Sequence, residues 1–416
     1  MRTVKPQRLG VAHRVIEAYD GPRLMVTGTI AFSFEAPEVP LHEAAMWTAI
    51  AKELDAPDVV LDEGVVKTRP EVLVVGRAYP PGGQKAIGCE VRLLVGPDEE
   101  PLVDKRLLVV GDRQWQTHGA SPPVPFREMP VTWARAYGGP DSKANPIGRG
   151  RIAVQDATGA TIHALPNIED PQGPVRSQHD EPRPVGFAPL DVRMAVRQHY
   201  AGTYDEAWAN DVAPALPQDF DWHFFNLAPP DQWLNRPWQA GDRFAVENMH
   251  PEHARLEGEI PSFKVRAWIT RVDDPDKALN EVPLTLDTVM LLPGAALAIA
   301  YHRGQLPVLH DDAADIDHLL LAAEAPSHEK PLEHYRQVFK KRTEGEYRGI
   351  YAMKDEDLLP PFPEDFDVMG LSELEGPGDV LGSENAYASN VQRHLQDKQA
   401  TTRAEVEASG AEVPPL

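Results

Sequence analysis

IGCEVRLLVGPDEEPLVDKRLLVV, residues 87–110, contains two apolar runs separated by a short turn. The first run places apolar side chains at every second position, namely Ile87, Cys89, Val91, Leu93 and Val95. The second run, 102–110, repeats this period of two, which is typical of a strand with one buried face. The turn GPDEEP at 96–101 joins the runs, so the stretch predicts a β-hairpin in which Cys89 is a buried strand residue.

The strand signal continues on both sides of this hairpin. LMVTGTIAFSF at 24–34 alternates Leu24, Val26, Ile30, Phe32 and Phe34 with mostly small polar residues, which predicts a half-buried strand. Further strands are predicted at 71–76, 260–272 and 282–301.

Helix signals are fewer and shorter. LHEAAMWTAIAKEL at 41–54 has helix-favouring composition and is bounded by prolines. A short helix is predicted at 203–210, with Thr203 as N-cap and Asp205 and Glu206 in its first turn. Two more helices are predicted at 311–325 and 331–342.

Residues 119–190 are dense in proline and glycine, yet they carry large apolar side chains. Those side chains are Trp133, Tyr137, Ile147, Ile152 and Phe187. We therefore expect long ordered loops. The predicted fold is mainly β (α+β), with peripheral helices and long Pro/Gly-rich ordered loops. It is either one elaborated β-sandwich spanning 1–342 or two β lobes, about 1–118 and 119–342.

The last part of the chain differs in composition. Residues 352–387 contain ten acidic side chains against the single basic Lys354, and the final thirty residues carry few large apolar groups. Too little can be buried there for a separate stable domain. We expect 343–416 to be an acidic, loosely structured tail.

Composition and charge exclude several classes of protein. The 416 residues include one cysteine, which excludes an internal disulfide and any multi-cysteine metal cage. A formal net charge of −23 is unfavourable for binding nucleic-acid phosphates. No segment has the apolar length of a signal peptide or a membrane span, so we expect a cytoplasmic protein.

Signals for catalysis are weak. The phosphate-binding, dinucleotide-binding, nucleophile-elbow and zinc-protease motifs are absent, and no cofactor is expected. The pairs His250–His253 and His328–His334 each enclose a proline, which disfavours a helical metal site, and His310 precedes two aspartates. Asp219 and Asp221 lie among aromatic residues; burial there would raise a carboxyl pKa, but we favour turn-capping aspartates.

Aromatic residues and prolines outside regular alternation are the strongest functional signal. They concentrate in 219–226 and in NLAPPDQWLNRPW at 226–238. Rings held in proline-rich loops are typical of protein-binding surfaces, where a single anchor contributes roughly 2 kcal/mol or more. A loop packed on its own domain is an equally good interpretation of this pattern.

Five blocks resemble a domain of unknown function encoded in bacterial type VI secretion loci. The blocks lie at 133–150, 201–208, 219–232, 246–261 and 284–308, and the resemblance extends over roughly residues 10–340. The chain departs from that pattern at Gly294 and at Tyr301 or His302, where an acidic residue and a tryptophan are more usual.

The resemblance implies an adaptor, or chaperone. Such a protein holds an effector toxin through its PAAR-like N-terminal domain and presents it to the secretion spike protein. From the aromatic loops and the blocks, we take as candidate partner-binding residues Trp133, Tyr137, Asn145, Tyr204, Trp208, Phe220, Trp222, Phe225, Asp231, Trp233, His250 and Arg303. A structural or immunity-like component of the secretion locus is one alternative, and a hydrolase or modifying enzyme using Asp219, Asp221 or His250 is another.

Overall fold

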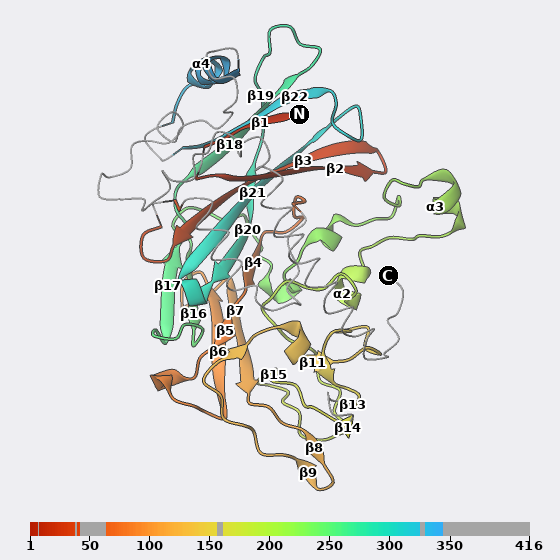
Figure 1. The fold of residues 1–416 in the computed structure, drawn as a ribbon, viewed down its shortest axis with the longest axis vertical. Coiled ribbons are helices and arrows are strands. Elements are labelled where there is room, and N and C mark those ends of the chain that lie inside the picture. Colours follow the sequence, from red (N-terminus) through yellow and green to blue (C-terminus); the bar gives the residue numbers. More distant parts are fainter. Residues whose placement is uncertain (7, 38–39, 42–63, 156–160, 325–328, 344–416) are drawn as a thin grey trace.

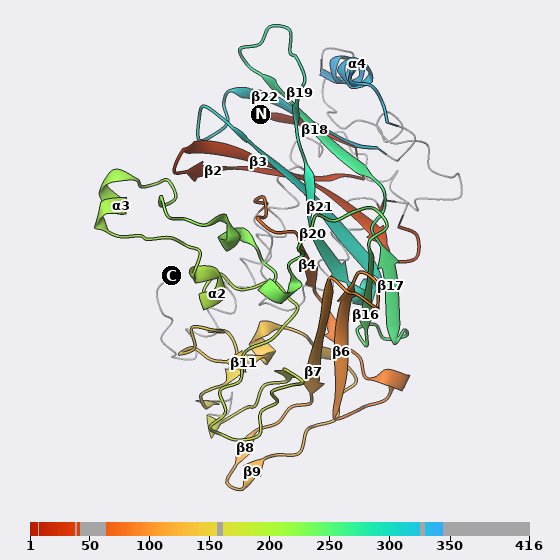
Figure 2. The same ribbon diagram turned by 180° about the vertical axis from the view of Figure 1, so that it is seen from behind.

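The computed structural model describes residues 1–6, 8–37, 40–41, 64–155, 161–324 and 329–343. Strands dominate this part of the chain, as predicted, and three sheets lie one above another along the long axis (Figures 1 and 2). Apart from residue 41, the helix predicted at 41–54 lies outside the described residues. The acidic tail beyond residue 343 also lies outside them.

The middle sheet has the strand order β2-β3-β21-β20-β4. Its strands are β2 (Gly10–Ala18), β3 (Gly21–Ser33), β21 (Leu297–Pro307), β20 (Thr285–Leu292) and β4 (Glu71–Val74). Neighbours are antiparallel except β4, which runs parallel to β20. The apolar run at 282–301 therefore forms two strands, because the turn η5 (Pro293–Ala295) interrupts it.

The lower sheet has the order β15-β7-β6-β16-β17. Its strands are β15 (Ile168–Glu169), β7 (Val103–Val110), β6 (Gly88–Val95), β16 (Arg243–Glu247) and β17 (Arg255–Glu259). The predicted hairpin is confirmed by the pairing of β6 with β7. Cys89 is buried as expected, whereas Ile87 precedes the strand and is 59% exposed.

The upper sheet has the order β1-β22-β18-β19. Its strands are β1 (Arg2–Val4), β22 (Ile316–Glu324), β18 (Lys264–Arg271) and β19 (Asn280–Val282). The helix predicted at 311–325 was wrong, because residues 316–324 of this segment form the strand β22. β22 lies between β1 and β18 and is buried on both faces, so its continuous Leu-Ala run reflects tertiary burial rather than helix propensity.

The remaining elements are short. Four two-stranded ribbons pair β5 (Arg77–Ala78) with β10 (Met129–Pro130), β8 (Trp115–Gln116) with β9 (Gly119–Ala120), β11 (Tyr137–Gly138) with β12 (Arg149–Gly150), and β13 (Val154–Gln155) with β14 (Thr161–Ile162). The helices are α2 (Ala195–Gln198), α3 (Glu206–Asp211) and α4 (Leu332–Thr343). Single turns are η1 (Pro81–Gly83), η2 (Trp133–Arg135), η3 (Trp222–Phe225) and η4 (Pro230–Gln232).

Two helix predictions have distinct outcomes. The helix at 331–342 is confirmed as α4, whose Tyr335 packs on Trp268 of the upper sheet at 4.6 Å between ring centroids. The predicted cap of α3 was wrong. Asp205 is the N-cap and accepts a hydrogen bond from the Trp208 N–H at 2.8 Å, whereas Thr203 bonds to Asp219.

Both faces of β3 are covered by other parts of the chain. On one face, Leu24, Val26 and Ile30 pack against the upper sheet, and Phe32 packs against the lower sheet. The other face is also covered, since Met25 packs with Phe225 and Ala31 packs with Leu227. The prediction of a half-buried strand was therefore wrong: β3 is buried on both sides, and the loop at 225–228 forms part of its second cover.

Candidate protein-docking surface

Partly exposed aromatic rings lie on the loops around α3, η3 and η4. The segment that contains α2 and α3 projects to one side of the sheets (Figure 1). We call this set of rings the aromatic shelf. Its members are Tyr200, Tyr204, Trp208, Phe220, Trp222, His223, Phe224 and Trp233. Tyr204 is the most open of the large apolar residues among them, with 51% of its surface exposed.

The rings of the shelf contact one another rather than lying singly. His223 stacks on Trp233 at 5.4 Å, and Tyr200 lies 5.3 Å from His223. Phe220 contacts Trp222 at 6.0 Å in a T-shaped arrangement. Tyr204 and Trp208 form a separate T-shaped pair at 4.7 Å. Offset and edge-to-face contacts at these separations are favourable, so the rings within each group support one another's orientation.

The inner side of the shelf rests on the second face of the middle sheet. Phe220, Trp222 and Phe224 pack against a buried cluster that contains Ile16 and Met25. The rings are therefore half in the core and half at the surface. This arrangement combines the two interpretations of the sequence, a loop packed on its own domain and an exposed contact surface.

Asp219 ties two loops of the shelf together. Its carboxylate accepts one hydrogen bond from the Thr203 N–H at 2.9 Å and another from the Thr203 hydroxyl at 2.7 Å. The hydrogen bonds from Thr203 lower the pKa of Asp219, so this carboxylate is charged at neutral pH. Its role is to fix the loop that leads into α3.

Asp221 is the N-cap of η3. It accepts hydrogen bonds from the His223 N–H at 2.9 Å and pairs with the His223 ring nitrogen Nδ1 at 2.7 Å. Burial acts to raise the pKa of Asp221, but the hydrogen bonds from His223 outweigh it, and the pKa is lowered. The favoured interpretation of turn-capping aspartates is therefore confirmed for Asp221, the N-cap of η3, but not for Asp219, whose carboxylate bonds to the distant Thr203.

A buried glutamate holds the segment that follows η3. Glu71, at the start of β4, accepts hydrogen bonds from Asn226 Nδ2 at 2.9 Å and from the Ala228 N–H at 3.0 Å. Asn226 in turn donates to the Arg69 carbonyl at 2.8 Å. A buried carboxylate that accepts several N–H groups fixes the path of the backbone, because leaving any of them unpaired is costly.

A buried lysine holds the segment around η4. Lys105 of β7 donates to the Gly186 carbonyl at 2.6 Å, to Asp231 at 2.7 Å and to Gln232 Oε1 at 2.8 Å. Burial lowers the pKa of Lys105 to about 8, against the opposing effect of Asp231. Gln232 continues the network by donating to the Val72 carbonyl at 2.7 Å.

A third buried charged residue supports the shelf from α2. Arg197 donates to the Phe224 carbonyl at 3.0 Å and to the Leu190 carbonyl at 3.2 Å, and its guanidinium lies 4.8 Å from the centroid of the Phe224 ring. Glu71 and Lys105 thus connect the shelf loops to the sheets, and Arg197 ties α2 to η3. The surface is preorganised, which reduces the entropy lost when a partner binds.

Several predicted candidates lie in the interior. Trp133, Tyr137, Asn145, Phe225 and Arg303 are each at most 8% exposed. Side chains this deeply buried cannot touch another protein in this structure, and they act as scaffold. Asn145 donates to the carbonyls of Trp133 and Tyr137, and Arg303 forms a buried ion pair with Asp287.

The other candidates lie at the surface in two places. Tyr204, Trp208, Phe220, Trp222 and Trp233 belong to the shelf, and Asp231 lies beside it, where it pairs with Lys105 and Arg183. His250 is elsewhere, in the connection between β16 and β17, where it stacks on His253 at 4.8 Å. Neither Asp219 nor Asp221 forms a contact with His250.

Among the residues that the structure describes, no group of three or more His, Cys, Asp or Glu side chains is placed to hold a metal ion. His328 lies outside those residues. Within the same ranges, every helix is too short or too polar to cross a membrane.

Sequence reasoning missed the anchors. Glu71, Lys105 and Arg197 are single charged residues in otherwise ordinary segments, and nothing in their local pattern distinguishes a buried charge from an exposed one. Of the residues that fix the shelf loops, only the aspartates at 219–221 gave a signal in the sequence, because Asp before an aromatic run is typical of a capping position.

A family model described as "Uncharacterized protein conserved in bacteria (DUF2169)" matches residues 21–303, which is more than half of the chain. The match covers β3 through the first half of β21 and includes the whole shelf. No curated protein and no solved structure matches the chain.

Proposed function

The chain belongs to the DUF2169 family of uncharacterized proteins conserved in bacteria, and we propose that this member is a type VI secretion adaptor. In this role it binds an effector toxin through the toxin's PAAR-like N-terminal domain and assists its loading onto the secretion spike. The proposal includes a cytoplasmic location and no catalytic step.

One observation carries the proposal: buried charged anchors hold the loops around η3 and η4, and Asp219 fixes the loop that carries Tyr204 and Trp208, so the partly exposed rings are held in place. Aromatic anchors in preorganised loops supply much of the binding free energy of protein interfaces. The five blocks that resemble the secretion-locus domain support the same conclusion. Two of them, 201–208 and 219–232, supply most of the shelf.

The first experiment tests the interaction itself. The chain, expressed with a toxin encoded beside it that begins with a PAAR-like domain, should co-purify with that toxin. Deleting the gene for the chain should abolish secretion of the toxin or lower its abundance. Normal secretion and abundance in the deletion strain would contradict the proposal.

The second experiment tests the shelf. Tyr204→Ala and Trp222→Ala should each weaken toxin binding by about thirtyfold, the effect of losing an anchor worth roughly 2 kcal/mol. Leu309→Ala is the matched control, because Leu309 is 73% exposed and lies outside the shelf. Equal affinities for all three variants, with unchanged thermal stability, would remove the shelf from the interface.

A growth assay separates an adaptor from an immunity-like protein. An immunity protein protects cells when it is expressed alone with the toxic domain of the effector. The adaptor proposed here should give no protection in that assay, since it binds the PAAR-like region instead.

A further inference from the structure

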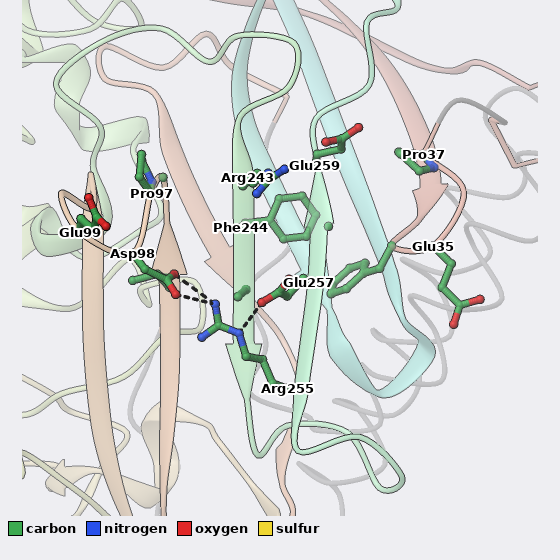
Figure 3. A pocket seen from close by; sticks show the side chains of 15 residues that line it. Glu35, Pro37, Pro97, Asp98, Glu99, Arg243, Phe244, Arg255, Glu257 and Glu259 are labelled. Carbon is green, nitrogen blue, oxygen red and sulfur yellow. Dashed lines mark hydrogen bonds and ion pairs between the residues drawn. The ribbon is translucent and has the colours of Figure 1, made fainter.

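The outer edge of the lower sheet carries a groove that the shelf does not use. The groove has a volume of about 640 Å³ and lies over β16 and β17, between the turn after β6 and the segment after β3 (Figure 3). Within the residue ranges that the structure describes, β17 is the last strand of its sheet, and one side of its backbone has no neighbouring strand.

The hydrogen-bonding pattern shows which backbone groups face outward. Ile260 donates to the Asp242 carbonyl and Asn248 donates to the Ala254 carbonyl, so the even-numbered residues of this ladder face β16. The N–H and C=O groups of Arg255, Glu257 and Glu259 therefore point away from β16. In the described part of the chain, no hydrogen bond engages these outward backbone groups.

The groove is lined by more negative than positive charge. Its lining includes the carboxylates of Glu35, Asp98, Glu99, Glu257 and Glu259, against the guanidinium groups of Arg243 and Arg255. Arg255 already pairs with Asp98 at 3.1 Å and with Glu257 at 2.5 Å (Figure 3). It also pairs with Glu247 at 2.7 Å. The outer rim at Glu35 and Glu259 keeps its negative charge exposed.

The floor of the groove is apolar and rigid. Phe34 and Phe244 meet edge to face at 5.0 Å, and both are buried. Gly258 allows this arrangement, because a Cβ on it would lie 2.5 Å from Cζ of Phe244. The ring of Phe244 thus lies against the strand at the position where β17 has no side chain.

We propose that β17 accepts an extended, basic segment of another polypeptide as an additional strand of the lower sheet. Backbone groups of the segment would pair with those of Arg255, Glu257 and Glu259, as in other cases of strand addition at a sheet edge. Lysine or arginine at alternate positions of the segment would face Glu257, Glu259 and Glu35 on one side of the sheet.

The negative charge of the groove favours a basic segment over two other possible occupants. A second copy of the chain, paired edge to edge, would bring together two grooves that each carry more carboxylates than guanidinium groups, which is unfavourable. The chain's own acidic segment, 352–387, carries the same sign of charge as the groove. The inference is independent of the adaptor role, because it concerns a surface separate from the shelf.

The test uses the full chain and a fluorescein-labelled synthetic peptide of about eight residues, the length of an ordinary strand, with Lys and Thr alternating. Fluorescence anisotropy should show saturable binding that weakens as salt is raised from about 50 to about 500 mM. A peptide with Glu in place of Lys should not bind. A Lys-Thr peptide methylated at alternate backbone nitrogens should bind at least about tenfold more weakly, since it cannot pair with β17.

Two pairs of variants separate backbone pairing from charge. Glu257→Pro removes an outward N–H of β17 without removing a hydrogen bond to β16, so this variant should fold but should not bind the peptide. Glu257→Gln keeps the N–H and should bind the peptide within about threefold of the wild-type affinity. Glu259→Lys should weaken binding by about tenfold, while Asp311→Lys, an equal charge change at an exposed residue away from the groove, should leave it within about twofold.

Circular dichroism and thermal unfolding establish that each variant is folded. Absence of binding to the Lys-Thr peptide at low salt would overturn the proposal, and the charged edge would then serve only to prevent self-pairing. Equal binding of the methylated peptide, or full binding by Glu257→Pro, would also overturn it, because the attraction would then be electrostatic without strand addition.

Discussion

At the scale of single residues, the structure depends on buried charged groups that connect loops to sheets. Lys105 is the most informative of these groups, because its ammonium has three hydrogen-bond partners and a lowered pKa. It reaches the segment that leads to Trp233, so its contribution to stability and its contribution to the shelf are linked.

Lys105→Met should destabilise the protein by about 2–4 kcal/mol at neutral pH, because the Gly186 carbonyl and Gln232 would lose a buried donor. Equilibrium unfolding in urea measures the change. Lys85→Met is the matched control, since Lys85 is exposed, and it should shift stability by less than about 0.5 kcal/mol. Equal effects of the two substitutions would show that the Lys105 network contributes nothing.

The lowered pKa of Lys105 also predicts how the stability of the protein changes with pH. Its pKa is about 8 in the folded state, whereas the ordinary pKa of a lysine, which the unfolded chain retains, is 10.5. Between these values the unfolded chain binds a proton that the folded chain has released, so stability rises with pH in this window. The stability of wild type relative to Lys105→Met should increase from pH 8 to pH 10.5. A flat difference would contradict the lowered pKa.

Cys89 gives a second prediction at this scale. Burial raises the pKa of its thiol to about 11, and the thiolate is the reactive form. Native protein should therefore react with a disulfide reagent at pH 8 at least about a hundredfold more slowly than protein unfolded in guanidinium chloride. Comparable rates in the two states would mean that the thiol is accessible.

At the scale of elements, close approach between sheets is the decisive feature. β3 lies against the upper sheet at Gly28, where a Cβ would be 2.9 Å from Cγ1 of Val265 and 3.3 Å from Cδ2 of Leu321. A glycine in a strand interior costs conformational entropy. Here it is required because the side chains of Val265 and Leu321 occupy the space that a Cβ would need.

Gly28→Ala should therefore lower the free energy of unfolding by about 1–3 kcal/mol through overpacking. The double variant Gly28→Ala with Val265→Ala should be less destabilised than the sum of the two single variants, because the second substitution makes room for the added methyl. Gly173→Ala is the control, since a Cβ there meets nothing within 4 Å. Strictly additive effects would show that the predicted clash is absent.

Local pattern predicted some elements and not others. It identified β6, β7 and α4, because alternation and helix-favouring composition agree there with the tertiary environment. It was wrong at β22, where leucine and alanine lie in a strand buried on both faces. It was incomplete at β3, since the cover over its second face comes from a loop about two hundred residues away in sequence.

At the scale of the whole molecule, charge is the property most relevant to partners. The net charge of −23 includes the ten acidic residues of 352–387. Long-range attraction between such a segment and a basic partner accelerates association, and salt screens it.

Truncation after residue 345 should lower the association rate constant with the toxin by about tenfold at low salt and should reduce its salt dependence. Stopped-flow fluorescence measures both quantities. A full-length variant with these acids changed to Asn and Gln should behave like the truncated chain, which separates charge from chain length. An unchanged rate constant and salt dependence would exclude electrostatic steering.

The sequence by itself determined the β-rich class, the central hairpin, the capping role of Asp221, and the concentration of aromatic residues at 219–238. Those features are local, because strand alternation, turn chemistry and caps depend on neighbours within a few residues. Only the tertiary structure decided which rings are exposed, which charges are buried, and that β17 lies at a sheet edge beside a groove. Burial and edge position depend on contacts between segments far apart in the chain, and no local pattern encodes them.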